Sequence, residues 1–473
     1  MRFLFARQGT KMINKNDETI IYIDGMGYDG EGVGRLGGIP VFVPYAAKGD
    51  TALVKIVKKT KSHMFGKLIS VTKPSDDRAE IVPCPVYGKC GGCSLMHLKY
   101  ESQLEFKRNR VKDCMKKIFR DEEINVLPVI SCENRFFYRN KIQLPIGTDK
   151  NGVVVSGFYA PHSHRIVQSD RCMLQNENLR SAVTGFLSWM SKNGVSTYDE
   201  KTNKGLVKHL FVRFGEYNGK PELVAMPVIN SKTVPDEESL KDEMIKQGVT
   251  TLCLNINTKK SNVILGDKTV TLYGSGYIKD VLLGKTFKIS PQSFYQVNRP
   301  QAEKLYRTAI NMASVTKDDI VYDLYCGAGT ISLCAADYAK HVYGIEMVES
   351  AVKNAEENAE INGIRNVTFF AGDVAEIVRK LKKTAVPDVV ILDPPRKGCS
   401  VETLELLAEI CPKKIVYVSC NPATLARDMA YLSEKGFAAG DVQPVDMFPQ
   451  TAHIETVVLL SQKKDKNTGN NYI

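Results

Sequence analysis

The feature that most constrains the fold is a regular alternation of short apolar runs and amphipathic stretches, which begins after Pro291 and continues to Leu460. The apolar runs have the length and composition of buried strands. We expect these strands near residues 319–323, 341–346, 366–371, 388–393, 414–419, 441–447 and 454–460. Helical stretches such as residues 350–362, closed by Gly363, supply the crossovers. The pattern predicts an α/β doubly wound, Rossmann-like domain, whose ligands bind at the carboxyl ends of its strands.

The remaining chain has a different organisation, and 473 residues are too many for one ordinary core. Short alternating strands separated by glycine-rich turns predict a small OB-like β-barrel, and irregular strands follow from Pro83 to about residue 285. The expected strands of the barrel are residues 19–23, 39–43, 51–57 and 65–71. We therefore predict a multidomain chain with a barrel at 12–75, a central α+β domain at 76–288, a catalytic domain at 289–462 and a mobile tail at 463–473, with Met12 as an alternative start.

The charge of the chain favours a polyanionic partner, because its net charge is +11 and basic residues lie in the loops of the predicted barrel. Small barrels with basic loops and stacking side chains commonly hold oligonucleotides, although a solvated basic face on a structural barrel has the same composition. The basic residues are Lys48, Lys55, Lys58, Lys59, Lys61, His63 and Lys67, with Tyr28, Tyr45 and Phe65 between them. No run approaches the roughly 18 apolar residues of a membrane span, and the first residues are too short for a secretory signal. We expect a cytoplasmic protein that needs no membrane and no obligate protein partner.

A cysteine follows one of the predicted strands in the segment Val416-Tyr417-Val418-Ser419-Cys420-Asn421-Pro422. A helix is expected to begin directly after it, and the free N–H groups and positive dipole end of a helix stabilise a thiolate. Cys420 is therefore a candidate nucleophile with an activated thiol. A buried structural cysteine is the alternative on this segment alone.

A glycine loop, Asp323-Leu324-Tyr325-Cys326-Gly327-Ala328-Gly329-Thr330, follows the first strand of the doubly wound domain. Its glycines allow close backbone approach to a ligand, and Glu346 at the end of the next strand can accept two ribose hydroxyl hydrogen bonds. Residue 332 is serine where a dinucleotide fingerprint has its third glycine, so a nucleoside without phosphates fits better than a pyrophosphate. Asp373 ends the third strand, where it can reach an adenine amino group.

The turn Asp393-Pro394-Pro395-Arg396 closes the fourth strand. Two prolines fix an extended backbone that lacks donors, which gives a rigid wall against a planar substrate. Nucleoside methyltransferases place an Asp/Asn-Pro-Pro turn of this kind beside the methyl donor. S-adenosylmethionine is therefore the leading cofactor.

Four further cysteines, Cys84, Cys90, Cys93 and Cys172, combine a compact group of three with a distant fourth. Four thiolates are enough for zinc or for a cubane iron–sulfur centre, and the spacing alone does not choose between them. Structural zinc more often uses two closely spaced pairs, which leaves zinc the weaker alternative.

Together these segments resemble the RNA uracil-C5 methyltransferase family over nearly the whole chain. The matching pieces are the barrel, which is similar to a TRAM domain, the four cysteines, the glycine loop, Ser290-Pro291-Gln292-Ser293-Phe294-Tyr295-Gln296-Val297-Asn298, Asp393-Pro394-Pro395-Arg396, Ser419-Cys420-Asn421-Pro422 and His453-Ile454-Glu455-Thr456-Val457. The resemblance implies a [4Fe-4S] cluster with a structural or RNA-positioning role. It also implies that the methyl donor is contacted by Gln292, Tyr325, Gly327, Glu346, Asp373 and Asp393.

The resemblance makes Cys420 the nucleophile that adds to C6 of uracil and Glu455 the general base that removes the C5 proton. Partial burial should raise the pKa of Glu455 toward the useful range. Family members with both a barrel and a cysteine cluster usually modify large-subunit ribosomal RNA. The expected reaction is therefore the formation of 5-methyluridine in 23S ribosomal RNA, with transfer RNA as the alternative substrate.

Three other functions are less compatible with the sequence. A cytosine-C5 methyltransferase would place a cysteine beside a proline in the fourth-strand motif, where this chain has Asp393. An exocyclic amino methyltransferase would give Cys420 no task. A non-catalytic RNA-binding or ribosome-assembly factor would not need the combination of Cys420, Glu455 and a donor site.

Overall fold

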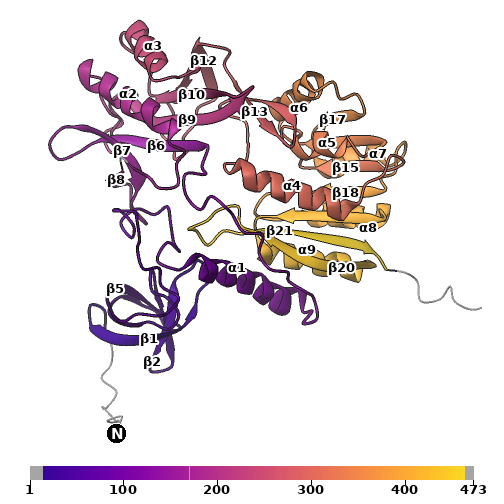
Figure 1. Cartoon of the computed structure of the whole chain (residues 1–473), viewed down its shortest axis with the longest axis horizontal. Coiled ribbons are helices and arrows are strands. Elements are labelled where there is room, and N and C mark those ends of the chain that lie inside the picture. Colours follow the sequence, from indigo (N-terminus) through magenta and orange to yellow (C-terminus); the bar gives the residue numbers. More distant parts are fainter. Residues whose placement is uncertain (1–13, 170, 464–473) are drawn as a thin grey trace, which may run out of the picture. The chain divides into compact units, whose positions relative to one another are not determined.

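The computed structural model describes residues 14–169 and 171–463 (Figure 1). The predicted start at Met12 and the predicted tail from residue 464 onward lie outside the described residues. The chain forms two compact units. The first contains the residues up to Arg110 together with Gln450–His453, and the second contains Val111–Pro449 and the residues from Ile454 onward. Each unit encloses its own hydrophobic core.

Five strands form a closed barrel in the order β1-β2-β3-β5-β4. They are β1 (Glu18–Met26), β2 (Gly32–Leu36), β3 (Ile39–Val43), β4 (Thr51–Lys59) and β5 (Met64–Lys73). Alternate side chains such as Ile21, Ile23 and Val54 point into the barrel and are buried. Strand β2 was not among the expected strands, because its sequence is short and contains two glycines. Packing requires both of them, since a Cβ on Gly32 would lie 2.7 Å from the carbonyl oxygen of Ala46 and one on Gly34 would lie 2.4 Å from the Ile21 side chain.

The segment after the barrel also belongs to the first unit. Arg78 forms an ion pair with the buried Asp50, with 2.7 Å between Nη2 and Oδ2, and the main-chain N–H of Ala47 donates to the same carboxylate at 2.6 Å. Leu95 and Leu98 pack with Ala47 in a small core of their own. Helix α1 (Tyr100–Cys114) and a π-helical turn, η1 (Met115–Phe119), follow.

The second unit contains two seven-stranded sheets and a two-stranded hairpin. The first sheet has the order β12-β11-β10-β9-β6-β7-β8 and buries its core against helices α2 (Asn178–Lys192) and α3 (Glu237–Lys246). Its strands are β6 (Lys141–Thr148), β7 (Val154–Tyr159), β8 (Ile166–Gln168), β9 (Val207–Tyr217), β10 (Lys220–Ile229), β11 (Thr251–Ile256) and β12 (Lys268–Tyr273). The hairpin consists of β13 (Ile278–Leu282) and β14 (Lys285–Ile289).

The second sheet has the order β17-β16-β15-β18-β19-β21-β20, drawn from orange to yellow in Figure 1. Its strands are β15 (Ile320–Leu324), β16 (His341–Glu346), β17 (Val367–Ala371), β18 (Val389–Leu392), β19 (Lys414–Ser419), β20 (Phe437–Val445) and β21 (Glu455–Gln462). The first five strands are parallel, and β21 runs antiparallel to both β19 and β20. Every strand expected in this domain is present, although β20 begins earlier than predicted.

Helices cover both faces of this sheet. The core of one face contains residues from α4 (Arg299–Ala313), α5 (Thr330–Ala335) and α6 (Glu349–Ile361), and the core of the other contains residues from α7 (Val374–Leu381), α8 (Val401–Ile410) and α9 (Pro422–Glu434). The strand order reverses at β15, which has β16 on one side and β18 on the other. This is the point where doubly wound sheets bind ligands. Among the described residues, no helix is both long and apolar enough to cross a membrane.

Candidate active site

The register of β19 and β21 brings the predicted nucleophile and the predicted base together. Ser419 pairs with Thr456, so the next position places Cys420 opposite Glu455. The Thr456 hydroxyl donates to the carbonyl of Ser419 at 3.0 Å and holds this end of the strand pair. Because β21 is antiparallel to its neighbour, its first residue lies at the carboxyl edge of the parallel strands. Two residues that are 35 positions apart in the sequence thus share one site.

Asp393 lies at the same edge, because it follows β18, the parallel neighbour of β19. Burial raises the pKa of Asp393 to about 7. Burial also raises the pKa of Glu455 well above its usual value, with a further rise from Asp393 and an opposing effect of Arg396. The rise predicted for Glu455 is therefore present. A carboxyl group of this kind is suited to accept a proton near neutral pH.

The structure contradicts the prediction that the thiol of Cys420 is activated. Burial, Glu455 and Asp393 raise its pKa to about 11, although Arg396 acts in the opposite direction. The start of α9, which follows Cys420, has fewer free N–H groups than expected. Pro422 has no N–H, and the N–H of Ala423 donates to the side chain of Asn421 at 3.1 Å. Burial and the acidic neighbours therefore outweigh the helix terminus, and the thiol is protonated in the free protein.

Hydrogen bonds hold the Asp393-Pro394-Pro395-Arg396 turn against the start of α9, which follows Cys420. The Asn421 side chain donates to the carbonyl of Arg396 at 3.1 Å, and the Thr424 hydroxyl donates to the same oxygen at 3.4 Å. The guanidinium of Arg396 acts electrostatically on both Cys420 and Glu455. The sequence motif predicted no role for Arg396, and its effect on Cys420 and Glu455 makes it a candidate for the reaction.

The glycine loop adopts backbone conformations that suit a ligand site. Tyr325, Gly327 and Gly329 all have positive φ, of 68°, 55° and 78°. A Cβ added to Gly327 would meet no atom within 4 Å, which leaves open space beside the loop. Gly329, in contrast, packs tightly, because a Cβ there would lie 2.9 Å from the ring of Phe369. The first glycine thus leaves room for a ligand, and the second allows close packing of helix and sheet.

Acidic groups surround the glycine loop. Each carboxylate oxygen of Glu346 accepts one main-chain hydrogen bond, from Gly327 at 3.1 Å and from Val348 at 3.0 Å, and retains acceptor capacity for ribose hydroxyls. Asp323 is buried with a pKa raised by burial to about 7, and its Oδ1 has no partner among the described residues. The exposed side chains of Met347 and Val348 offer an apolar surface beside Glu346. These features fit the nucleoside and sulfonium of S-adenosylmethionine.

Two of the predicted donor contacts, Asp373 and Gln292, lie on the surface. Asp373 is exposed and caps α7, with its Oδ1 accepting from Ala375 at 2.9 Å and from Glu376 at 3.2 Å. Gln292 is exposed, and its amide donates to Gly266 at 3.4 Å and to Thr269 at 3.2 Å in the preceding sheet. The Gln292 amide is therefore bound to the sheet that contains β12 and is not among the groups that act on Asp393 and Glu455.

Two residues without a predicted role, Tyr306 and Gln296, lie close to Asp393 and Glu455 instead. Tyr306, on α4, is buried, and its hydroxyl interacts with the side chains of Gln296 and Thr330. Burial and then Asp393 raise its pKa, and Glu455 contributes in the same direction. Gln296 belongs to the same motif as Gln292, and nothing in the sequence favours it over Gln292. Tyr306 lies in a helix without any sequence feature that marks it.

The four cysteines of the predicted cluster show part of the expected arrangement. Cys84, Cys90 and Cys93 belong to the first unit and Cys172 to the second, and all four are half-buried. The Sγ of Cys90 accepts a hydrogen bond from the main-chain N–H of Gly92 at 3.3 Å. Burial and then both Cys90 and Cys93 raise the pKa of Tyr45, so these two thiols share one neighbourhood. In the described part of the chain, no group of three or more His, Cys, Asp or Glu residues is arranged to hold a metal ion. The residues fit thiolate ligation in part.

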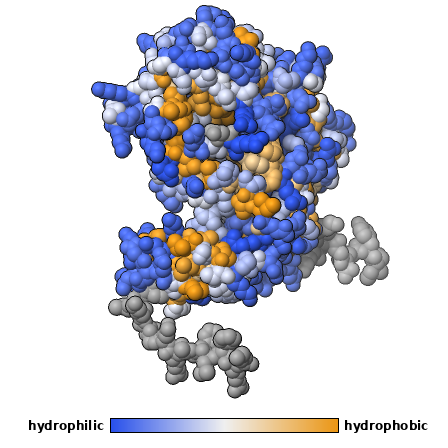
Figure 2. Space-filling model, turned by 60° about the vertical axis from the view of Figure 1, so that its left-hand side comes forward, coloured by the Kyte–Doolittle hydropathy of each residue, from blue (hydrophilic) through white to orange (hydrophobic). Residues whose placement is uncertain are grey.

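The barrel surface carries exposed apolar side chains as well as the predicted basic residues. Ile20 and Tyr22 on β1 are each 60% exposed, and Ile69 on β5 is 45% exposed. Figure 2 shows hydrophobic side chains on the barrel at the bottom of the view. Phe65 packs with Phe42 and His63, and the ammonium of Lys58 lies 5.8 Å from its ring centroid. Aromatic and cationic groups are therefore adjacent, as in single-strand binding barrels.

Comparisons with known proteins identify the family of this chain. The model of the tRNA (uracil-5-)-methyltransferase family matches residues 99–463, and the model of the TRAM domain matches residues 18–69. An uncharacterized RNA methyltransferase of Clostridium acetobutylicum is 44% identical over 455 residues, which cover 95% of this chain and 98% of the relative. One of Listeria monocytogenes is 44% identical over 451 residues, with coverage of 95% and 98%.

A solved structure is similar over almost the same length. It is the Pyrococcus abyssi tRNA (uracil-54, C5)-methyltransferase in complex with S-adenosyl-L-homocysteine, with a TM-score of 0.76 and 28% identity. The similarity covers 93% of this chain and 99% of that chain. The chain described here belongs to the tRNA (uracil-5-)-methyltransferase family and is an S-adenosylmethionine-dependent RNA methyltransferase with a TRAM domain.

Proposed function

We propose that the protein methylates C5 of uridine in 23S ribosomal RNA, with Cys420 as the nucleophile and Glu455 as the general base. The observation that carries this proposal is the strand register that sets Cys420 opposite Glu455, beside Asp393 and next to the glycine loop. A methyltransferase that acts on an exocyclic amine has no use for a thiol and a base in this relation. The pair is the requirement of C5 chemistry on a pyrimidine.

The chemistry follows from the weak nucleophilicity of C5 in uracil. The Cys420 thiolate forms a bond to C6, and the electrons of the C5–C6 double bond move into an enolate. C5 then takes the methyl group. Glu455 removes the proton from C5, the double bond reforms, and the bond between sulfur and C6 breaks to release the thiolate. When bound, S-adenosylmethionine supplies the methyl group on a positively charged sulfur, and this charge favours anionic groups beside it.

The thiol has to lose its proton before it attacks. With a pKa of about 11, Cys420 keeps that proton in the free enzyme at neutral pH. We assign the thiolate to the assembled complex, in which Arg396 is the cationic side chain that opposes the effect of Asp393 and Glu455. A protonated thiol reacts slowly with oxidants, so the acidic surroundings also protect the nucleophile between turnovers.

The donor site is proposed to consist of Tyr325, Gly327, Glu346, Asp373 and Asp393. Glu346 receives the ribose, and Asp373 receives the adenine amino group through the carboxylate oxygen that does not cap α7. We propose Gln296 as a further donor-site residue, since it is buried beside Tyr306, while Gln292 hydrogen-bonds to the neighbouring sheet. Gln296→Ala should raise the KM for S-adenosylmethionine more than Gln292→Ala does. Equal effects of both substitutions would remove the assignment.

Methyl transfer from labelled S-adenosylmethionine to unmodified ribosomal and transfer RNA, followed by nucleoside mass spectrometry, tests the proposed reaction. We expect 5-methyluridine in 23S ribosomal RNA. The formation of 5-methylcytidine would overturn the target base, and the absence of any product on either RNA would leave an RNA-binding factor. Cys420→Ala should abolish methylation, with Cys411→Ala as the matched control because Cys411 is exposed and lies outside the site.

Transfer RNA is the second candidate substrate. The family model and the Pyrococcus abyssi relative both carry transfer RNA in their names, and that relative is 28% identical to this chain. The barrel and the cysteine loop together favour ribosomal RNA through the family resemblance. If 5-methyluridine forms only in transfer RNA, the chemistry stands and the substrate changes.

We also propose that Cys84, Cys90, Cys93 and Cys172 hold a [4Fe-4S] cluster with a structural role. The shared neighbourhood of Cys90 and Cys93 and the N–H···S hydrogen bond from Gly92 support thiolate ligation. Protein purified without oxygen should contain iron and acid-labile sulfide, which Cys90→Ala removes and Cys411→Ala retains. Zinc in place of iron would establish the alternative.

The barrel is proposed to grip the RNA next to the target. Its basic residues should release counterions from the RNA when it binds. Replacement of Lys55, Lys58 and Lys59 by glutamine should weaken RNA binding and make its salt dependence less steep. An unchanged salt slope would show that the barrel has another role. This substitution is preferable to deletion of residues 1–75, because such a deletion would remove Asp50 from its ion pair with Arg78.

A further inference from the structure

Two cations face each other in the sheet that contains β6 and β9. Lys141 on β6 pairs with Arg213 on β9 in the antiparallel register, so their side chains lie on the same face of the sheet. Their neighbours Ile142 and Val212 belong to the core on the other face, which α2 and α3 cover. Like charges directly opposite each other destabilise a pair of strands. The two cations therefore need an explanation other than the stability of the sheet.

Arg139 adds a third cation to this group. Burial, then Arg213 and then Arg139 lower the pKa of Lys141 to about 8, and no carboxylate opposes these effects. Among the described residues, neither Lys141 nor Arg139 forms an ion pair or a side-chain hydrogen bond. Both side chains are half-buried, so they can reach a ligand at the surface. The two accessible cations thus have no anionic partner within the described part of the chain.

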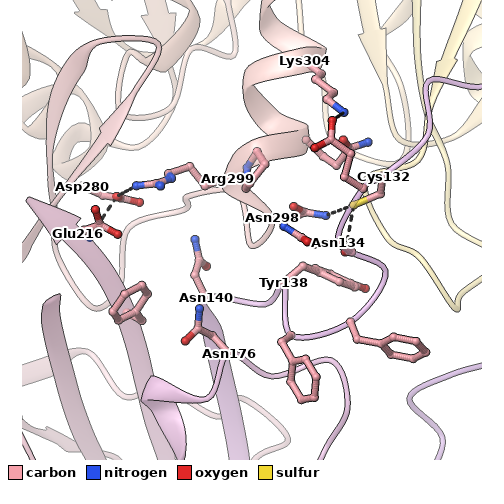
Figure 3. A pocket seen from close by; sticks show the side chains of 16 residues that line it. Cys132, Asn134, Tyr138, Asn140, Asn176, Glu216, Asp280, Asn298, Arg299 and Lys304 are labelled. Carbon is pink, nitrogen blue, oxygen red and sulfur yellow. Dashed lines mark hydrogen bonds and ion pairs between the residues drawn. The ribbon is translucent and has the colours of Figure 1, made fainter. Parts of the chain in front are cut away.

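The carboxylate that acts on Arg213 is already paired with another cation. Burial lowers the pKa of Arg213 to about 10, while Tyr295 and Asp280 act in the opposite direction. Asp280 forms an ion pair with Arg299, with 3.0 Å between Nη1 and Oδ1, on the wall of the cavity that Figure 3 shows. The charge of Asp280 is therefore shared, and an excess of positive charge is left around Lys141.

Arg213 connects this group of cations to the motif of residues 290–298. Its guanidinium donates to the carbonyl of Ser290 and to that of Ser293, each at 2.9 Å. The same motif contains Gln296, which is proposed above as a donor-site residue. Because Arg213 is only 1% exposed, it acts on a ligand at the surface through its charge and not through a hydrogen bond.

Asn140, directly before Lys141, connects the accessible cations to the catalytic residues. Its main-chain N–H donates to the carbonyl of Val297 at 2.8 Å, and its side chain donates to that of Gln296 at 3.0 Å. The side chain of Gln296 interacts with Tyr306, whose pKa is raised by burial and then by the carboxylates next to the nucleophile. An anion bound to Lys141 therefore lies close to the proposed site of the target uracil.

We propose that Arg139 and Lys141 bind a backbone phosphate of the RNA beside the target nucleotide, with Arg213 as the buried cation that strengthens the site. The inference rests on the proposed function, because the phosphate belongs to the RNA substrate. A phosphodiester carries one negative charge and accepts hydrogen bonds from both an ammonium and a guanidinium group. Phosphate contacts fix the register of a nucleic acid without reading its sequence. The site should therefore align the RNA strand rather than select a base.

The first test measures RNA binding and needs no methylation. A short, fluorescently labelled oligouridylate is titrated with the full-length protein at several salt concentrations, with S-adenosylhomocysteine present, and its anisotropy is recorded. Loss of one phosphate contact in Lys141→Gln should weaken binding about fivefold at roughly 0.1 M salt and lower the slope of log affinity against log salt by about 0.7. Lys141→Arg should retain most of the affinity.

Lys192→Gln is the matched control for the change in net charge. Lys192 is exposed at the end of α2, which covers the other face of the same sheet. Its substitution should leave the affinity and the salt slope close to those of the wild type. If Lys141→Gln binds the oligouridylate as Lys192→Gln does, or binds more weakly with an unchanged salt slope, no phosphate is bound at Lys141 and the inference falls.

A second readout separates this site from a structural role of the lysine. Lys141→Gln removes the like charge opposite Arg213, so the melting temperature of the protein should rise by about 1 to 3 °C, while Lys192→Gln leaves it unchanged. Weaker RNA binding together with higher stability is the combination that a ligand site predicts. A lower melting temperature of Lys141→Gln would show that Lys141 stabilises the sheet and would contradict the inference.

The last test measures methylation by Lys141→Gln. The KM for RNA should rise about fivefold, whereas the KM for S-adenosylmethionine should not change. A rise in the KM for S-adenosylmethionine instead would show that the cations bind the carboxylate of the methyl donor, and the phosphate site would be refuted. If the wild-type protein methylates no RNA but its binding of oligouridylate depends on Lys141, the proposed function fails and the phosphate site stands.

Discussion

The acidic surroundings of Cys420 lead to a prediction about the reactivity of its thiol. With a pKa of about 11, only about one thiol in a thousand is ionised at pH 8, because the thiolate fraction falls tenfold for each pH unit below the pKa. Cys420 should therefore react slowly with iodoacetamide in the free protein, despite its position at the start of a helix. Peptide mass spectrometry can measure its alkylation rate separately from those of the other cysteines.

The substitution Glu455→Gln removes one of the two like charges next to the thiol without changing its volume. Loss of a like charge from a buried neighbour should lower the thiol pKa by roughly one to two units, which corresponds to a 10- to 100-fold faster alkylation. The effect requires that Glu455 is ionised in the wild-type protein, and the pKa of this carboxyl group is itself raised. The alkylation rate of Cys420 in Glu455→Gln, divided by that in the wild type, should therefore be near one at low pH and should increase as the pH rises.

The assay follows the alkylation of Cys420 from pH 6 to pH 10 in the wild type, in Glu455→Gln and in Glu434→Gln, an exposed control on α9. Glu434→Gln should match the wild type throughout. A Cys420 pKa below 8 would show that the helix terminus controls the thiol, and identical pH profiles for the wild type and Glu455→Gln would show that Glu455 does not contribute to the raised pKa of Cys420.

Three further predictions concern stability and the cofactor loop. Arg78→Met leaves the buried Asp50 without its ion pair and should lower the free energy of unfolding of the first unit by about 3 to 5 kcal/mol, measured by urea titration with Lys99→Met as the control. Gly344→Ala places a Cβ 2.4 Å from the ring of Phe369 and should cost about 1 to 3 kcal/mol, with weaker binding of S-adenosylhomocysteine in calorimetry. The raised pKa of Asp323, about 7, means that its contribution to stability is complete below about pH 4 and is lost as the pH rises through 7. Asp323→Asn should therefore lose roughly 4 kcal/mol less stability than the wild type between pH 4 and pH 8, and equal pH dependence in urea unfolding would contradict the raised pKa.

The alternation of strands and helices after Pro291 was sufficient to predict the second sheet, because buried parallel strands are continuous apolar runs. The barrel was predicted with one strand fewer, since the two glycines of β2 hide a strand whose neighbours need the space. The extent of the first unit was not visible in the sequence. The ion pair between Arg78 and Asp50 attaches the segment after residue 75 to the barrel, and such pairings leave no periodic pattern.

The candidate site was predictable where motifs lie at strand ends and was not predictable where it depends on tertiary contacts. Cys420 and Asp393 follow strands that periodicity reveals, but the antiparallel register that adds Glu455 is a property of the folded sheet. The raised pKa of Cys420 comes from its burial and then from this proximity, so the helix start alone predicted the wrong direction of the pKa shift. Gln296 lies in a quoted motif and Tyr306 in a helix of mixed composition, and only the fold brings them close to Asp393 and Glu455.

The central claim is that Cys420 attacks uracil while Glu455 removes the C5 proton. The most direct measurement is mass spectrometry of Glu455→Gln after incubation with RNA and S-adenosylmethionine, followed by digestion with trypsin and nuclease. We expect a peptide containing Cys420 that carries a methylated uridine nucleotide, and the adduct should survive denaturing gel electrophoresis. An unmodified Cys420 peptide from a variant that binds RNA and S-adenosylmethionine normally would contradict the claim.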